Sequence, residues 1–418
     1  MTERSLDTVP SARLGWLDAL RAVAALAVVL DHSSYAFLPE LRRELMPQFT
    51  VGRYGIMLFF LVSGYIVPAS LERRGCVRTF WIGRAFRMYP LWAAAVTAVL
   101  VLDLLGIAEL RAGPGRENLA AVAVAHVTLL QELLGTPSLL LVLWTLSYEM
   151  AFYLLVVALF TVRLHRRSAA VAVTLAALAA VSAVVNAAAG GALPVSALSG
   201  AVGTGPLVAL AALALALAIG CASAGTPSLR VAGGVLGGVS ALVLVAFNGT
   251  VAMWEGLVIL AVMFLGTAVQ RAENDGSGRR RVAGAAAVVV VCAVGSAYLY
   301  GDGTHSTRRG WILAFLMAAL TFGAGLAARH RRVPRPLTAL GTISYSVYLV
   351  HPVLLTVTDG TVGRWRHDVP ALEAAFLAVL LPLCALTHRY VEVPGQAWGR
   401  RLARRVQPGS RGGGQPMW

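Results

Sequence analysis

Charged residues are scarce in this chain, and lysine is absent altogether. Only 13% of the 418 residues are charged, whereas 58% are hydrophobic and the mean hydropathy is +0.72. A water-soluble domain needs more polar residues than this to cover its surface. The composition therefore excludes an ordinary soluble protein and predicts that a lipid bilayer surrounds most of the chain.

Cysteine is also rare. The four cysteines lie far apart, without the close pairs that metal sites and redox motifs use: they are Cys76, Cys221, Cys292 and Cys384. We interpret them as helix-packing residues, and we expect neither a bound metal nor a bound cofactor.

The basic residues are all arginine, and they give a formal net charge of +15. In a soluble protein this charge would suggest nucleic acid, but here the arginines form short clusters between apolar runs, which is the pattern of the positive-inside rule. We therefore expect no nucleic-acid partner. We expect a multi-pass protein of a bacterial cell membrane with both termini in the cytoplasm; the sequence leaves its oligomeric state open.

Apolar runs long enough to cross a bilayer, about 20 residues each, predict twelve spans. They lie at 14–37, 53–71, 89–109, 140–162, 168–190, 204–222, 230–247, 252–270, 282–300, 309–328, 338–358 and 370–390. If these spans alternate in direction, the arginine-rich connections all fall on one side, which should be cytoplasmic. One more crossing around His126, at 119–134, would break this agreement, so we expect an outer-face or re-entrant segment there.

The predicted fold class is thus all-α, a polytopic membrane bundle of about 10–12 transmembrane helices. We expect a cytoplasmic tail at 1–13, a membrane domain at 14–395 and a disordered cytoplasmic tail at 396–418.

The first span carries two ionisable residues that point to one interior. Arg21 and His32 stand eleven residues apart, which places them on one helix face about 16 Å apart along the axis. Charge within a bilayer is costly and usually faces a cavity or a partner; Asp18, one turn earlier, can pair with Arg21. The alternative is an arginine that snorkels from the helix end and a histidine satisfied by a neighbour.

A second basic pair follows the second span. Arg84 and Arg87 are three residues apart and so face the same way on a helix, and paired guanidinium groups suit a phosphate. They can equally be cytoplasmic arginines that fix topology.

The later spans carry further polar groups. Glu149 stands about two turns inside its span, near Trp144 and Ser147. It can pair with a buried cation such as Arg21, or act as an acid or base, or both. Tyr345 and His351 suggest a polar lining in another span, where His351 fits a hydrogen-bonded wall residue better than a catalyst.

Six motifs, in the order in which they occur along the chain, resemble the acyltransferase-3 family of integral membrane acyltransferases. No single motif is specific, but the ordered set spans nearly the whole chain. It consists of Arg21-x10-His32, the run LFFLVSGYIV, Arg84-x-x-Arg87 before Tyr89-Pro90, the segment from Trp144 to Glu149, the run from Ser344 to His351, and Glu392-Val-Pro394. The chain departs from the family pattern at Asp31, beside the histidine, and at Tyr148 and Met150, beside Glu149.

The resemblance implies that His32 is the essential histidine, with Arg21 as its motif partner. It also implies that Arg84 and Arg87 help to hold an acyl-CoA donor, most commonly acetyl-CoA, from the cytoplasmic side. A histidine can take the proton of an attacking hydroxyl or carry the acyl group itself. We predict His32 and Glu149 as catalytic residues, and a substrate-binding set of Arg21, Arg84, Arg87, Trp144, Ser147 and Tyr345.

The function that the resemblance implies is O-acyl transfer from the co-substrate acyl-CoA to a hydroxyl of a sugar, glycan or macrolide-type natural product. The expected acyl group is acetyl. Many family members append a hydrolase-like domain, which we do not find here, so we expect the membrane part to act alone or with a separate partner. The main alternative is a polytopic secondary transporter, and a third is a catalytically silent membrane scaffold.

Overall fold

The computed structural model describes residues 15–108, 118–191, 196–275, 278–303 and 306–406. Within these ranges helices are the only regular secondary structure. Eleven of them are long and apolar enough to cross a membrane, or twelve if one bent pair forms a single span. The predicted all-α membrane bundle is confirmed, and the predicted tail at 1–13 lies outside the described residues. The chain divides into two units, which are described separately below.

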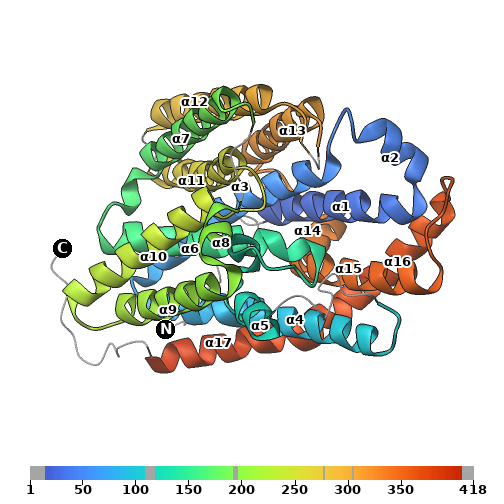
Figure 1. Cartoon of the computed structure of the whole chain (residues 1–418), viewed down its shortest axis with the longest axis horizontal. Coiled ribbons are helices and arrows are strands. Elements are labelled where there is room, and N and C mark those ends of the chain that lie inside the picture. The colour runs from blue at the N-terminus through green and yellow to red at the C-terminus, as the bar shows by residue number, and fades with distance from the viewer. Residues whose placement is uncertain (1–14, 109–117, 192–195, 276–277, 304–305, 407–418) are drawn as a thin grey trace, which may run out of the picture. The chain divides into compact units, whose positions relative to one another are not determined.

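Unit 1 comprises Met1–Tyr65, Ser168–Pro194 and Ala252–Cys384. Within it α7 packs against α11 and α12, which run side by side in Figure 1. The other main contacts join α1 to α14 and α15. The helices of this unit are α1 (Gly15–Phe37), α2 (Pro39–Leu45), α3 (Val51–Arg74, as far as Tyr65), α7 (Ser168–Ala188), α11 (Met253–Asp275), α12 (Arg279–Tyr300), α13 (Arg308–Ala327), α14 (Arg335–Thr342), α15 (Ser344–Thr361) and α16 (Pro370–Thr387, as far as Cys384).

Helices α3 and α11 approach each other backbone to backbone. A Cβ atom added at Gly64 would lie 1.9 Å from the carbonyl oxygen of Met263, and one at Gly266 would lie 2.4 Å from that of Leu61. The hydroxyl of Thr267 donates a hydrogen bond of 2.8 Å to the carbonyl of Gly64. Small residues allow such close approach between membrane helices, and polar side chains then bridge them.

The predicted span at 338–358 is not one straight helix. Helices α14 and α15 are bent by 66° at a short break. At the end of α14, Gly341 lies so close to α1 that an added Cβ would come within 1.9 Å of the Asp18 carbonyl oxygen. The bend therefore follows from close packing of α14 on α1, which hydropathy alone does not reveal. It also begins α15 at Ser344, the helix that carries His351.

Unit 2 comprises Ile66–Arg167, Val195–Val251 and Ala385–Trp418. In it α10 packs on α6 and α9, and α17 packs on α4. Glycines in α10 allow its close approach to α9, since a Cβ at Gly233 would meet the backbone nitrogen of Ala222 at 2.3 Å. The helices are α4 (Val77–Leu104), α5 (Leu119–Val127), α6 (Trp144–Thr161), α8 (Ala197–Val202), α9 (Thr204–Ala222), α10 (Pro227–Phe247) and α17 (Val393–Val406), with short helical turns at Gln131–Leu134, Leu141–Leu143, His165–Arg167 and His388–Glu392.

The segment around His126 is too short to cross a membrane. Helix α5 has 9 residues, which correspond to about 14 Å of rise against a hydrocarbon core of about 30 Å. The His126 ring is buried and bonds Val122 O and Leu139 N through its two nitrogens, at 2.9 and 3.1 Å. This agrees with the expectation that 119–134 adds no crossing.

The disordered tail that we expected from residue 396 is helical as far as Val406. Helix α17 lies against α4, where Gly399 faces Phe86 and an added Cβ would meet the Cβ atom of Phe86 at 2.5 Å. Packing on α4 therefore orders a basic, Arg-rich segment that looks too polar for a span. Residues 407–418 lie outside the described residues.

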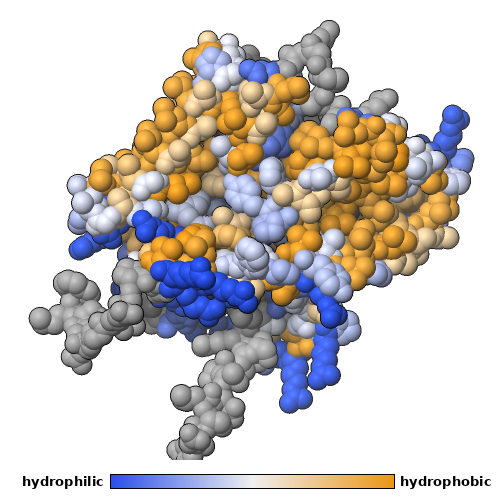
Figure 2. All heavy atoms as spheres, turned by 90° about the horizontal axis from the view of Figure 1, so that it is seen from below, coloured by the Kyte–Doolittle hydropathy of each residue, from blue (hydrophilic) through white to orange (hydrophobic). Residues whose placement is uncertain are grey.

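Large apolar side chains are exposed on several helices, as a lipid-facing surface requires. On α9, Leu210, Leu213 and Leu217 are 61%, 58% and 49% exposed. Figure 2 shows apolar residues over wide areas of one face. These surfaces fit hydrocarbon rather than water.

Candidate active site

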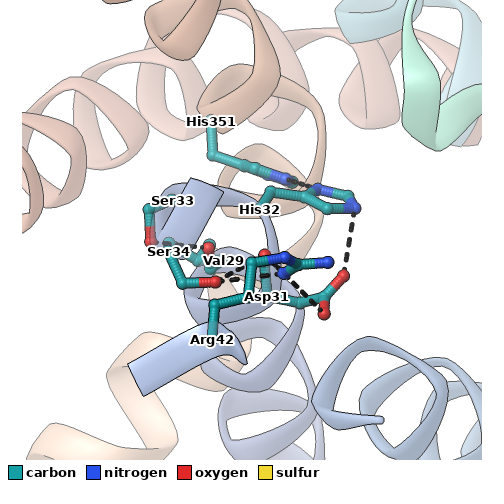
Figure 3. Close-up of polar contacts among 7 residues, drawn as sticks. All are labelled: Val29, Asp31, His32, Ser33, Ser34, Arg42 and His351. Carbon is teal, nitrogen blue, oxygen red and sulfur yellow. Dashed lines mark hydrogen bonds and ion pairs between the residues drawn. The ribbon is translucent and has the colours of Figure 1, made fainter. Parts of the chain in front are cut away.

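His32 lies near the C-terminal end of α1 and contacts a second histidine. Its Nδ1 is 2.8 Å from Nε2 of His351 on α15 (Figure 3). The two rings are inclined by only 23°, with centroids 5.1 Å apart, so the hydrogen bond lies close to both ring planes. His351 is fully buried and is bound at its other nitrogen, since Nδ1 lies 2.8 Å from the carbonyl oxygen of Val347.

The other edge of the His32 ring faces a carboxylate. Asp31 Oδ2 is 3.8 Å from His32 Nε2, too far for a hydrogen bond but close enough to attract the ring whenever it is protonated. Arg42 holds Asp31 from α2: its Nη1 donates to the Asp31 carbonyl at 2.5 Å and lies 3.3 Å from Oδ1 (Figure 3). The Arg42 guanidinium stacks on the Tyr35 ring, 3.4 Å from its centroid. Asp31 is thus fixed beside His32.

Ser33, the next residue of α1, binds a buried carboxylate. Its hydroxyl donates to Glu373 Oε1 at 2.6 Å, and Glu373 is only 7% exposed. This bond links α1 to the first turn of α16. The segment of α1 around His32 is therefore bound to three elements: α2 through Arg42, α15 through His351 and α16 through Glu373.

Arg21 lies on the same helix as His32, as predicted. Its guanidinium is 3.8 Å from the Asp18 carboxylate one turn away. Eleven residues separate Arg21 from His32, about 16 Å of helix. Tyr345, the predicted substrate-binding residue of α15, is half-buried in unit 1.

The second group of predicted residues lies in unit 2. The Arg84 guanidinium sits 5.7 Å from the ring centroids of both Phe80 and Tyr153, and the Tyr153 hydroxyl donates to Glu149 Oε1 at 2.5 Å. Arg84 Nε is buried without a hydrogen-bond partner. Neither Arg84 nor Arg87 forms an ion pair with any residue that the structure describes. The positive charge of each guanidinium group can therefore interact with a bound anion.

Two more predicted residues lie on α6 with Glu149. The Trp144 ring meets the Tyr148 ring edge-on, with centroids 5.8 Å apart. Ser147 is fully buried, and its hydroxyl accepts a bond of 3.3 Å from the backbone N–H of Glu132. Ser147 therefore ties α6 to the helical turn at 131–134.

The predicted site residues thus fall into two sets. Unit 1 holds Arg21, His32 and Tyr345, and unit 2 holds Arg84, Arg87, Trp144, Ser147 and Glu149.

Comparison with known proteins decides the family. Residues 14–389 match the family model of the Acyl_transf_3 acyltransferase domain. The chain belongs to the acyltransferase-3 family. The predicted family is thus confirmed, and membership favours the predicted acyltransferase function over the transporter and the silent scaffold.

Two curated acyltransferases are similar to parts of this acyltransferase-3 protein. It is 31% identical over 150 residues to acyltransferase MdmB of Streptomyces mycarofaciens, which covers 34% of this chain and 38% of that protein. It is 27% identical over 172 residues to peptidoglycan O-acetyltransferase OatA of Listeria monocytogenes, covering 37% of this chain and 24% of that protein. The matches thus span well under half of each relative. No solved structure matches the chain.

Sequence reasoning missed three contacts in this protein. His351 was expected to be a hydrogen-bonded wall residue, and it is buried and hydrogen-bonded, but the sequence did not reveal that its partner is His32. No role was predicted for Arg42 or Glu373, because each lies beside a polar motif rather than inside one. The one available signal was a buried carboxylate at the start of an apolar span, which needs a partner.

Proposed function

We propose that this acyltransferase moves an acetyl group from acetyl-CoA to a hydroxyl of an acceptor, with His32 as the group that takes the hydroxyl proton. The observation that carries the proposal is the pose of the His32 ring. His351 holds it through Nδ1, and its Nε2 edge faces Asp31 without a hydrogen bond. An imidazole with one nitrogen bonded to a neutral ring and the other edge beside a carboxylate is suited to general base catalysis near neutral pH.

In the proposed reaction, His32 carries the proton from the acceptor hydroxyl to the leaving thiolate, so no further proton donor or acceptor is needed. His32 Nε2 takes the proton from the acceptor hydroxyl while that oxygen attacks the thioester carbonyl carbon. The carbon–sulfur bond then breaks, and the leaving thiolate receives the proton from His32 as free CoA thiol. The Asp31 carboxylate, 3.8 Å from Nε2, stabilises the imidazolium that forms between the two proton transfers.

Arg84 and Arg87 are the proposed donor-binding residues. A guanidinium donates two parallel charge-assisted hydrogen bonds to a phosphate, and neither of these arginines is occupied by a carboxylate among the described residues. Glu149 supports them indirectly: it holds the hydroxyl of Tyr153, whose ring lies against Arg84. The phosphates of CoA are the anions that this pair fits.

The proposed acceptor is a hydroxyl of a sugar, glycan or macrolide-type natural product. A glycan is supported by the relative from Listeria monocytogenes, which is named a peptidoglycan O-acetyltransferase. Acetyl as the acyl group is supported by the same name.

The donor proposal is tested by steady-state thiol release from acetyl-CoA by the purified protein with a panel of hydroxyl acceptors. In Arg84→Gln and Arg87→Gln we expect the KM for acetyl-CoA to rise by at least about tenfold, since each lost hydrogen bond between charged groups is worth about 1.5–3 kcal/mol. Arg166→Gln, which changes an exposed arginine of the same unit, is the matched control. An unchanged KM in both site variants would remove the donor role.

A further inference from the structure

The bond between the two histidines fixes more than the position of His32. Hydrogen positions follow from the partners, because a carbonyl oxygen only accepts. His351 Nδ1 lies 2.8 Å from the Val347 carbonyl oxygen, so this nitrogen carries a proton. In a neutral ring the other nitrogen, Nε2, is then a lone-pair acceptor.

His351 is neutral on structural grounds. Its side chain is completely buried, and its polar neighbours include the Val347 carbonyl, the Tyr348 backbone and the rings of His32 and Tyr348. A charged ring buried without a carboxylate partner is strongly disfavoured. The Nε2 atom that faces His32 therefore carries no proton and is a hydrogen-bond acceptor.

The proton between the rings must then belong to His32. His32 Nδ1 donates across the 2.8 Å distance to His351 Nε2, so in the neutral ring His32 Nε2 carries no proton. The opposite tautomer would set two lone pairs against each other at 2.8 Å. It would gain no bond to Asp31 in return, since Oδ2 lies 3.8 Å from Nε2.

We propose that His351 is the positioning residue that holds His32 in the Nδ1-protonated tautomer, so that Nε2 is the basic atom of the reaction. It does for His32 what a buried carboxylate does for the histidine of a hydrolase triad, but as a neutral acceptor. When His32 gains a proton on Nε2, the bond to His351 becomes charge-assisted and stronger. This stabilises the transient imidazolium without placing a second charge on α15.

The inference rests on the proposed role of His32, and the test separates the two. Nitrogen-15 NMR of histidine-labelled protein in detergent reports the tautomer of His32 without any substrate, and the His32→Gln variant assigns its signals. We expect Nδ1 of His32 to be protonated and Nε2 to be unprotonated in the resting protein. Protonation at Nε2 instead would overturn the proposal.

Two variants then test the link to turnover. His351→Gln keeps an acceptor oxygen near the Nε2 position, and His351→Leu removes the acceptor at similar size. We expect His351→Leu to lose Nδ1 protonation as the single form and to lower kcat about 10- to 100-fold, part of the typical contribution of general base catalysis, with the KM for acetyl-CoA within about twofold. His351→Gln should keep both the tautomer and most of kcat.

Wild-type kcat in His351→Leu, or equal losses in both variants with the His32 tautomer unchanged, would overturn the positioning role. Size-exclusion profiles and unfolding curves of both variants show whether a loss is one of folding. If His32→Gln itself keeps full activity, the proposed function fails while the NMR result still decides the tautomer.

Discussion

The close contact between α3 and α11 leads to a quantitative prediction for Gly64→Ala. The added methyl carbon would lie 1.9 Å from the carbonyl oxygen of Met263, where ordinary contact begins at 3.4 Å. The two helices must therefore move apart by up to 3.4 − 1.9 = 1.5 Å at this point. The obstacle is backbone, so no side-chain rotation can relieve it.

The expected cost has two parts. Overpacking of a well-packed contact costs about 1–3 kcal/mol. The hydrogen bond from buried Thr267 to the Gly64 carbonyl, 2.8 Å long, is stretched by the same movement, and a typical bond contributes about 1 kcal/mol. We therefore expect Gly64→Ala to lower the free energy of unfolding by about 2–4 kcal/mol.

The assay is reversible unfolding of the purified protein in mixed micelles with increasing sodium dodecyl sulfate. Gly323→Ala on α13 is the matched control, because its added Cβ has no atom within 4 Å, and alanine is favoured over glycine in a helix by up to about 1 kcal/mol. The reasoning is refuted if Gly64→Ala and Gly323→Ala unfold with the same free energy.

Two further predictions concern Asp31, beside His32, and Glu40 on α2. In Gly52→Ala the added Cβ would lie 2.5 Å from Asp31 Oδ2, so the carboxylate must leave its place beside Arg42 and His32; we expect kcat to fall severalfold with little change in stability, and an unaltered kcat would show that Asp31 does not assist. Near α2, the hydrogen bond from His367 and the backbone N–H of Asp368 lower the pKa of Glu40 below its ordinary value. The contact therefore contributes in full above the ordinary carboxylate range and is lost as the pH falls through the lowered pKa; His367→Ala should reduce this part of the pH dependence of unfolding, and identical pH profiles for the two proteins would contradict it.

Much of the fold follows from the sequence because the bilayer imposes a length and an apolar composition on every span. The bend between α14 and α15 could not be found this way. It depends on the approach of Gly341 to α1, a contact between segments more than 300 residues apart. Helix α17 was missed for a related reason, since its order comes from packing on α4 rather than from hydropathy.

The site was only partly predictable. The spacing of Arg21 and His32 on one helix is local, so sequence periodicity sufficed. The partner of His32 is 319 residues away and that of Ser33 is 340 residues away, and no local pattern indicates which helices meet. His351 therefore could not be distinguished from an ordinary buried histidine until its neighbours were known.

The most direct test of the account is the rate of acyl transfer by His32→Gln. With acetyl-CoA and a hydroxyl acceptor that the wild-type protein uses, release of CoA thiol and formation of the acetylated product should both fall at least about 100-fold, the lower range for general base catalysis. His330→Gln, at an exposed histidine outside the site, should keep the wild-type rate. Equal rates for His32→Gln and the wild-type protein would contradict the assignment of His32 as the catalytic base.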